Sequence, residues 1–154
     1  MEIRFLAEHP ELVPTLAQWL HREWGYYDPH QTLETKISAL SARLQTNSLP
    51  LALVAMVRGQ PVGTASLRLD DLPDRPDLSP WLAGVYVVPE HRNKGIASAL
   101  CKRIAAEASR LGIVQLYLCT EDQENLYRKL GWSVHERLKS RGEDTVVMTN
   151  STVA

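Results

Sequence analysis

The sequence predicts an α/β domain on one mixed β-sheet of about six to seven strands, flanked by about four helices. Stretches with apolar residues at helical spacing alternate along the chain with short apolar runs typical of strands. One of these runs, "WLAGVYVV", is apolar on both faces, as expected of a central strand. The length of 154 residues suits one domain, and we expect residues 1–154 to form it.

A strand and two helices are predicted first. "IRFL" near the N-terminus is a short strand. Apolar residues then recur every fourth position over Leu12–Trp24, which marks one face of a helix. That helix can hold Pro14 only in its first turn, and Gly25 would end it. A second helix is expected from about Leu33, with Thr32 as its N-cap.

A hairpin, a loop and the central strand follow. "LPLALVAMVRGQPVGTASLRL" contains two apolar runs joined by the turn "RGQP", which predicts a β-hairpin. "DDLPDRPDLSP" holds three prolines and four aspartates and is therefore predicted to be a loop. "WLAGVYVV" comes next as the central strand.

The remaining elements complete the order β-α-α-β-β-β-α-β-α-β-β. Apolar residues over Ile96–Leu111 fall on one helical face, with Glu107 among the charged residues away from it, and Gly112 is a stop signal. "VQLYLC" is another buried strand. Thr120 and Gln123 have the spacing of a capping box before a short helix. "WSVHERL" and "TVVMT" form a last hairpin around "RGED".

Composition argues against several classes of protein. The chain has 17 Lys+Arg against 18 Asp+Glu and a net charge of −1, which disfavours a nucleic-acid partner. No stretch approaches the ~18 apolar residues of a membrane span. The charges in "MEIRFLAEHPE" argue against an export signal, so we expect a cytoplasmic protein without a membrane partner. Neither Cys101 and Cys119 nor the five histidines have metal-ligand spacing, so no metal is expected. A monomer and a homodimer both stay open.

"VYVVPEHRNKGIASAL", residues 85–100, joins the central strand to a helix through a basic loop. The first N–H groups of a helix lack internal partners, and the helix dipole adds about half a positive charge there. Gly95 would let the backbone approach an anion closely, and Arg92 and Lys94 add positive charge. The turn therefore suits a phosphate or pyrophosphate, unless Gly95 only permits a tight turn. Neither GxxxxGK[ST] nor a GxGxxG opening a first βαβ unit is present.

"VxVxPEHRxKGIA", the amphipathic helix after it, and "YRKLGW" together resemble the GNAT superfamily of N-acetyltransferases. The order of elements matches across essentially the whole chain. The resemblance implies a GNAT-like domain with splayed central strands, acetyl-CoA as cosubstrate, and a primary amine of a small molecule, peptide or protein as acceptor. It assigns the pantetheine contacts to Val85, Tyr86 and Val87. It assigns the pyrophosphate cradle to Arg92, Asn93, Lys94, Gly95, Ile96 and Ala97.

The resemblance also suggests roles in the chemistry. Tyr127 would give a proton to the CoA sulfur; the alternative is a core tyrosine beside Trp132. A backbone N–H of the splayed strand, at Val87, would polarise the carbonyl. Gly84 fits either a bulge in that strand or a small residue in a crowded sheet. Cys119 offers a covalent ping-pong route, but direct transfer is favoured because a lone cysteine at a strand end is more often simply packed.

Two departures from the family pattern leave roles open. Many relatives carry a glutamate on a central strand as the general base, but the predicted central strands here contain no acid. An acceptor with an α-amine, whose pKa is near 7.7–8.0, would depend least on such a base. The candidates for the base, besides an ordered water, are Glu90, Asp70, Asp71 and Tyr117. "TEDQEN" is short for the segment whose asparagine touches pantetheine in many relatives. Its replacements would be Thr120, Asp122 or Gln123, unless Thr120 and Gln123 only cap a helix.

"EWGYYDPHQ", residues 23–31, clusters aromatic side chains and a carboxylate between the first two helices. Tyr26, Tyr27 and Asp28 would form a binding lip for a cationic amine, or else an ordinary exposed loop. Two functions follow: an N-acetyltransferase that works by direct transfer in a ternary complex, or a non-catalytic acyl-CoA-binding sensor. Tyr127 argues against the sensor, which needs no proton donor.

Overall fold

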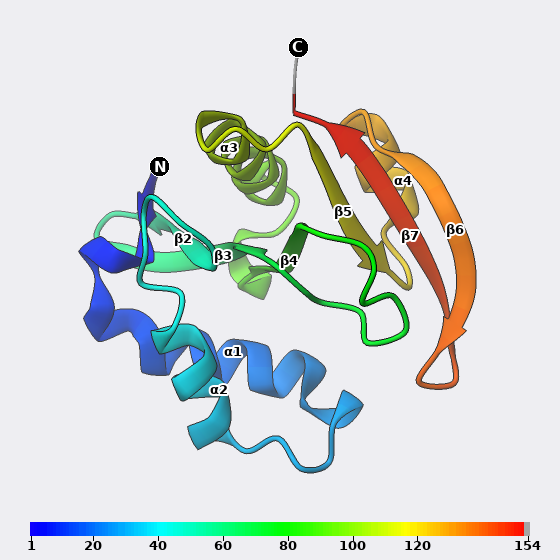
Figure 1. Cartoon of the computed structure of the whole chain (residues 1–154). Helices are drawn as coiled ribbons and strands as arrows, with labels where there is room; N and C mark the ends of the chain where they lie inside the picture. Colours follow the sequence, from blue (N-terminus) through cyan, green and yellow to red (C-terminus); the bar gives the residue numbers. More distant parts are fainter. Residues whose placement is uncertain (153–154) are drawn as a thin grey trace.

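The computed structural model describes residues 1–152, apart from the side chain of Tyr26. A seven-stranded sheet runs through it in the order β1-β2-β3-β4-β5-β7-β6 (Figure 1). β4 and β5 are parallel and the other neighbouring pairs are antiparallel, which confirms the predicted mixed sheet. The strands are Glu2–Phe5 (β1), Leu51–Val57 (β2), Gln60–Arg68 (β3), Trp81–Val87 (β4), Gln115–Thr120 (β5), Ser133–Ser140 (β6) and Glu143–Ser151 (β7).

Helices connect these strands in the predicted order. The α-helices of the described chain are Val13–Trp24 (α1), Leu33–Ser41 (α2), Ile96–Arg110 (α3) and Glu124–Lys129 (α4). Within residues 1–152, none of the helices combines the length and the apolar character that crossing a membrane requires.

The helix ends follow from local chemistry. Pro14 lies in the first turn of α1, where its missing N–H leaves no bond unmade, and Gly25 is the C-cap. Thr32 caps α2 as predicted: its Oγ1 accepts the Thr35 N–H at 3.1 Å, and Thr35 Oγ1 accepts the Thr32 N–H at 2.9 Å. Gly112, with φ 82°, follows α3 in the left-handed conformation that suits glycine.

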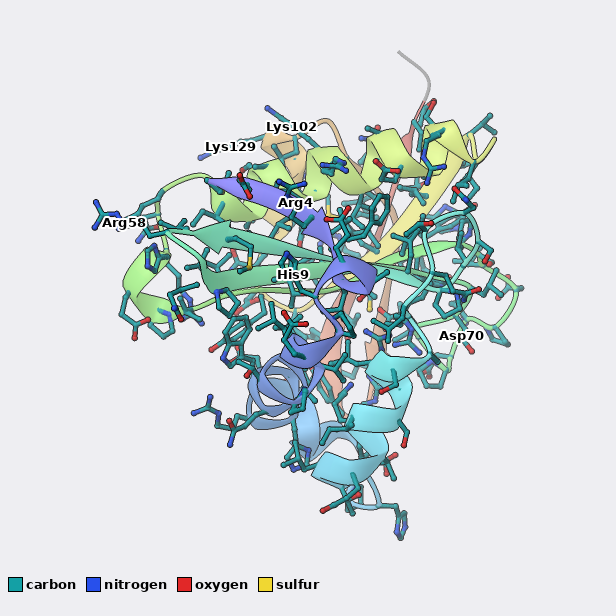
Figure 2. All side chains as sticks on the ribbon, turned by 90° about the vertical axis from the view of Figure 1, so that its left-hand side faces the viewer. Arg4, His9, Arg58, Asp70, Lys102 and Lys129 are labelled. Carbon is teal, nitrogen blue, oxygen red and sulfur yellow. The ribbon has the colours of Figure 1, made fainter. Side chains whose placement is uncertain are left out.

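The helices cover both faces of the sheet. α3 and α4 lie on one face, and α1 and α2 lie on the other (Figure 1). In Figure 2 the sheet is seen nearly edge-on, with Lys102 of α3 on one side and α1 and α2 on the opposite side. The largest core cluster, which includes Leu100 and Ile104, lies under α3, and a second, which includes Leu16 and Leu20, lies under α1. A small third cluster surrounds Trp81.

Two local predictions need correction. The β2–β3 turn consists of Arg58 and Gly59 alone, because both adopt positive φ (52° and 77°), so β3 already begins at Gln60. Glu107, expected on the solvent side of α3, is only 8% exposed. Arg103 and Arg110 donate to its two carboxylate oxygens and neutralise it, which permits this burial.

Candidate active site

The sheet opens between β4 and β5. Trp81 opposite Tyr117 is the single position at which the two strands pair within residues 1–152. Beside it, the Tyr117 N–H donates to the Pro80 carbonyl at 3.0 Å. Beyond this point β4 and β5 separate towards their C-terminal ends (Figure 1), which confirms the expected splay of the central strands. Beyond Trp81 the facing backbone edges of β4 and β5 therefore do not pair with each other, and an unpaired edge is what an extended ligand joins when it pairs like a strand.

Gly84 forms a bulge where the opening begins. Thr64 lies opposite Tyr86 and Ser66 opposite Ala83, so β4 has one more residue than β3 in this interval. Gly84 has φ 62°, which glycine adopts without steric strain. The strand is buried up to Ala83, half-buried over residues 84–86, and buried again at Val87.

The loop between β4 and α3 is exposed and has an unusual backbone. After a 3₁₀ turn at Pro89–His91, Asn93 (φ 62°) and Gly95 (φ 80°) both adopt the left-handed conformation. Residues Arg92–Gly95 are exposed, and a Cβ at Gly95 would meet no atom of the described residues within 4 Å. No side chain in the described chain caps α3. Its first N–H groups therefore face open space next to the opening, an arrangement that suits an anion.

Arg92 folds back on β4 and fixes the loop to the strand. Its Nε donates to the Val87 carbonyl at 2.8 Å, and its guanidinium lies 5.5 Å from the centre of the Tyr86 ring. The Val88 N–H donates to the Val62 carbonyl on β3 at 2.9 Å. Because successive N–H groups of a strand alternate in direction, the Val87 N–H points to the other edge of β4, the edge that β5 has left.

The side chains of β4 at the opening belong to opposite core layers. Val85 packs against the cluster under α3. Tyr86 packs on the α1 side, with its ring centre 5.6 Å from that of Trp19 and 6.5 Å from that of Trp24. At the N-terminal turn of α3, Ile96 is buried. These side chains are therefore packed in the core layers, and the groups of β4 that line the opening are those of its backbone.

Tyr127, on α4, lies at the margin of the core on the α3 side. Its side chain is 8% exposed, and its ring packs edge-on against Trp132 at 6.3 Å. Burial, followed by the nearby Cys101, Cys119 and Asp122, raises the pKa of the Tyr127 phenol above its usual value, so the hydroxyl keeps its proton at neutral pH. No group of the described residues hydrogen-bonds this hydroxyl, and it is not among their fully enclosed polar atoms that lack a partner. The ring is thus a core residue whose hydroxyl reaches accessible space.

Asp71 and Cys119 meet on the α1/α2 side of the opening. The Cys119 thiol donates to Asp71 Oδ2 at 3.4 Å. Burial, and then the neighbouring Asp71 carboxylate, raise the pKa of Cys119 well above its usual value, which keeps the thiol protonated. Burial also raises the pKa of Asp71, against the opposing effect of the Arg68 guanidinium, whose Nη1 lies 3.7 Å from Asp71 Oδ1.

The four side-chain candidates for a base differ in their surroundings. Asp70 and Glu90 are exposed, and Figure 2 shows Asp70 at the outer side of the molecule. Tyr117 is packed, with its ring centre 5.9 Å from that of Trp81. Asp71 is partly buried. Its carboxylate contacts Cys119 on β5, beyond the point where β5 leaves β4.

The connection between α1 and α2 reaches the opposite half of the sheet. The Tyr27 hydroxyl donates to Glu121 Oε1, and the Arg141 guanidinium lies 4.6 Å from the centre of the Tyr27 ring. Asp28 Oδ1 accepts the backbone N–H two residues further on, at 2.9 Å, in a local turn. The side chain of Tyr26 lies outside the described part of the structure. Tyr27 therefore joins α1 and α2 to the β5–α4 loop and the β6–β7 turn.

The residues considered as replacements for a pantetheine-binding asparagine lie in the turn before α4, where Thr120 makes a hydrogen bond within the turn. Thr120 Oγ1 accepts the Gln123 N–H at 3.0 Å, and Gln123 is the N-cap of α4. Thr120 therefore closes the turn before the helix, while Asp122 and Gln123 are exposed.

Sequence reasoning missed two cationic residues that the fold turns inwards. Arg43, just after α2, is 3% exposed, and burial, followed by Arg68, lowers its pKa to about 10. Burial, followed by Arg43, lowers the pKa of Lys36 on α2 to about 8. Lys36 lies within α2, whereas Arg43 lies in the turn that follows the helix, so no helical spacing relates the two residues and no pattern in the sequence marked them.

The opening therefore combines two kinds of binding group. An uncapped helix end suited to an anion lies on the α3 side, and a partly buried carboxylate lies on the α1/α2 side. Within residues 1–152, no three His, Cys, Asp or Glu side chains are grouped so that they could hold a metal ion. The arrangement can hold an extended phosphate-bearing molecule along β4 and present an amine to it.

Comparison with protein families gives a match over most of the chain. A family model described as "Acetyltransferase (GNAT) family" matches residues 13–132, which is more than half of the chain.

Solved structures share the fold over nearly their whole length. An aminoglycoside 6′-N-acetyltransferase complexed with coenzyme A is 16% identical, with a TM-score of 0.80 over 100% of this chain and 98% of that chain. A ribosomal-protein-alanine N-acetyltransferase from Brucella melitensis is 24% identical, with a TM-score of 0.74 over 98% and 99% of the two chains. A structure from Salmonella typhimurium with its cofactor acetyl-CoA is 21% identical, with a TM-score of 0.73 over 100% and 95%. At these identities the likeness concerns the fold.

Proposed function

The chain belongs to the GNAT family of acetyltransferases, and from this premise we propose that it transfers the acetyl group of acetyl-CoA directly to a primary amine in a ternary complex. The amine belongs to a small molecule, a peptide or a protein, and residues 1–154 act as a single N-acetyltransferase domain. The observation that supports this most is the opening between β4 and β5, which adjoins the uncapped N-terminus of α3. The cytoplasmic location and the oligomeric state stay predictions.

The cofactor assignment uses backbone groups. We assign the pyrophosphate to the loop Arg92–Ala97, where the first N–H groups of α3 are open, and the pantetheine arm to the free edge of Val85–Val87. Arg92 is already bonded to the Val87 carbonyl, so its side chain holds the loop against β4. Lys94 is exposed and adds positive charge next to the phosphates.

The reaction requires a polarised carbonyl and a protonated leaving group. The neutral amine attacks the thioester carbonyl carbon, whose oxygen takes the negative charge and accepts a hydrogen bond from the Val87 N–H. The carbonyl re-forms as the carbon–sulfur bond breaks and its electron pair goes to sulfur. Tyr127 gives its proton to that sulfur, and the proton lost by the amine goes to Asp71 or to water. The Tyr127 phenolate then regains a proton through water, so the overall reaction moves one proton from the amine to the sulfur. The products are an N-acetylated amine and free CoA thiol.

The raised pKa of the neighbouring Cys101 thiol supports Tyr127 as the proton donor. A phenol with a raised pKa is a weak acid, so it transfers its proton only to a strong base. Burial raises the pKa of Cys101, a neighbour of Tyr127, to about 12. A CoA thiolate that forms in the same surroundings becomes more basic for the same reason. The pKa of the CoA thiol then rises together with that of the Tyr127 phenol, so the difference between them is smaller than burial of the phenol alone would produce.

Direct transfer is favoured over a covalent route through Cys119. The thiolate is the reactive form of cysteine, and both burial and Asp71 oppose its formation here. Asp71 is more suitable as the acceptor of the amine proton, since a raised pKa makes a carboxylate a better base.

The test is release of CoA thiol in the presence of a broad panel of amines and peptides, read with a thiol-reactive dye and confirmed by the mass of the product. Melting of the protein with acetyl-CoA is measured in parallel, and ligand at 100 times its dissociation constant should add ~2.7 kcal/mol of stability. Thiol release that depends on an amine supports the proposal. A melting shift without any acetylated product would favour the acyl-CoA sensor instead, and the absence of a shift at millimolar acetyl-CoA would overturn the cofactor assignment.

A further inference from the structure

The buried guanidinium of Arg43 has few partners inside the protein. Its Nη1 donates to Ser66 Oγ at 3.0 Å, and this is its one hydrogen bond within the described residues. A guanidinium carries five N–H donors. Nε and Nη2 have no hydrogen bond in the described residues and are not among the fully enclosed atoms that lack a partner, so they keep some contact with accessible space although the residue is only 3% exposed. Buried donors of this kind are costly unless an acceptor occupies that space.

This guanidinium lies at the start of the opening between β4 and β5. A Cβ at Gly84, the bulge residue, would be 3.9 Å from Arg43 Nη1. Its partner Ser66 is opposite Ala83 in the β3–β4 ladder. Arg43 thus reaches β4 from the α2 side, whereas Tyr127 and the N-terminus of α3 lie on the other side of the sheet. A molecule that entered the opening from the α1/α2 side would meet the guanidinium.

The charges around Arg43 leave an excess of positive charge. Arg68 lies close enough to Arg43 to add to the effect of burial in lowering the pKa of Arg43, and Arg43 and Arg68 together add to the effect of burial in lowering the pKa of Lys36. The two carboxylates of this group, Asp70 and Asp71, pair with Arg68 at 3.4 and 3.7 Å. Three cations therefore face two carboxylates. Within residues 1–152, no hydrogen bond or ion pair engages the side-chain ammonium of Lys36.

We propose that Arg43, with Lys36 beside it, binds the carboxylate of the acceptor, so that the acetylated molecule is an amino-carboxylate of the amino-acid type. This inference rests on the proposed N-acetyltransferase function and specifies its substrate class. The carboxylate accepts the free N–H donors of Arg43, and the amine of the same molecule lies towards Asp71 and the edge of β4. Asp71 contacts Cys119 on β5, so the two charged ends of the acceptor have opposite charges facing them across the opening.

The first experiment uses the unmodified protein and needs no variant. Amino acids with α- or ω-amines are compared with their carboxamides as acceptors, at equal concentrations of the neutral amine, because amidation alters the pKa of a nearby amine. We expect kcat/KM to be at least tenfold higher for the carboxylate in the preferred pair. Equal or faster transfer to the carboxamides in every pair would overturn the proposal, while leaving the N-acetyltransferase function intact.

The second experiment removes the charge of Arg43. Arg43→Met keeps length and apolar volume, and replacement of a buried ion by an apolar residue is often tolerated. We expect kcat/KM to fall about 10²-fold for the amino-carboxylate, as expected for loss of a charged hydrogen bond, and to change little for its carboxamide. Arg43→Lys should restore part of the preference. Arg22→Met, at an exposed arginine of α1, is the matched control and should preserve it. A preference that survives Arg43→Met would overturn the assignment.

A binding measurement separates this site from turnover. The melting temperature of the CoA-bound protein is recorded with an N-acetyl amino acid and with its carboxamide. The carboxylate form should stabilise the unmodified protein more, and Arg43→Met should lose this difference while keeping its melting shift with acetyl-CoA. Equal stabilisation by the two probes would count against the carboxylate site. Failure of the proposed function would appear differently, as the absence of acetylated product from every amine.

Discussion

The two sides of the opening between β4 and β5 are built in different ways. On the α3 side, one continuous stretch, residues 85–97, contributes a strand edge, a loop and a helix end, and the groups that we assign to the cofactor are mostly backbone N–H groups. On the α1/α2 side, the polar groups are side chains of Arg43, Ser66, Asp71, Cys119 and Arg141, which come from five separate segments.

This difference predicts how each side responds to substitution. Backbone binding groups depend on φ and ψ, so the cofactor side should tolerate many side-chain changes and fail when its glycines change. A constellation of side chains should fail when one charged group is removed, even if the backbone is unchanged. Tyr127 differs from the other groups on its side, because it packs on the α3 side but its proposed role depends on a side-chain hydroxyl.

Tyr127→Phe should give the largest effect. The substitution removes one hydroxyl and almost no volume, so the packing against Trp132 should persist. General acid catalysis contributes about 10²–10⁴-fold, and kcat should fall within that range. The KM for acetyl-CoA should change little, because the proton is needed in the transition state. Steady-state kinetics with an identified acceptor measures both.

Cys119→Ser is the control for the covalent route. Serine keeps a donor for Asp71, so the variant should retain activity within about tenfold of the unmodified protein. An inactive but folded Cys119→Ser would reverse the choice between direct and covalent transfer. Normal turnover by Tyr127→Phe would make Tyr127 a core residue only.

Gly95→Asp tests the cofactor side alone. The carboxylate would project into the open space next to the first N–H groups of α3, where the pyrophosphate is expected, and like charges in contact cost several kcal/mol. We expect affinity for acetyl-CoA to fall by about 10²-fold or more. Gly95→Asn is the matched control, since it has the same size and tolerates the left-handed backbone without the charge. Equal affinities of the two variants would mean that no phosphate binds at this loop.

Gly84→Ala tests whether the bulge contributes to acetyl transfer, beyond the backbone strain that an alanine causes at any position of positive φ. An alanine at φ 62° costs about 1–2 kcal/mol, and the nearest atoms are at an ordinary 3.9 Å, so the cost is in the backbone. Gly59→Ala, in the β2–β3 turn, carries similar strain at φ 77° far from the opening. Both variants should lose similar stability in denaturant unfolding, but only Gly84→Ala should also slow acetyl transfer. Equal activities would show that the bulge has no role in the site.

Lys36→Met gives the smallest expected effect and depends on pH. The pKa of Lys36 is lowered from 10.5 to about 8 in the folded protein, so the unfolded chain holds this proton more tightly. Stability of the unmodified protein should therefore rise as the pH increases from about 8 towards 10.5, where folded Lys36 becomes neutral. The variant should be more stable at pH 7, by less than about 1 kcal/mol after solvent screening, and this advantage should shrink by pH 10.

Denaturant unfolding at pH 7 and pH 10 measures the difference, with Lys102→Met on the exposed side of α3 as the control. An advantage of Lys36→Met that is the same at both pH values would show that the lysine is not held in a cationic group.

The sequence determined most of the fold and predicted the segment to which we assign the cofactor. Both depend on local information: the spacing of apolar residues gave the order of helices and strands, and the proline, basic residues and glycine after "WLAGVYVV" marked a helix end suited to an anion. Thr32, Pro14 and Gly112 marked helix ends through chemistry that acts within one turn. Such signals lie in consecutive residues, so they can be identified without knowledge of what packs nearby.

Only the tertiary structure decided the α1/α2 side of the opening. Arg43 and Asp71 look like ordinary surface residues in the sequence, and their surroundings appear only when α2, β3 and β5 come together. Glu107 differs, because Arg103 and Arg110, the arginines that neutralise it, lie four residues before it and three residues after it on the same helix. Burial also raised the pKa of Tyr127 and Cys119 and lowered that of Lys36. Desolvation and charge proximity depend on distances between residues far apart in the chain, and no local pattern in the sequence encodes them.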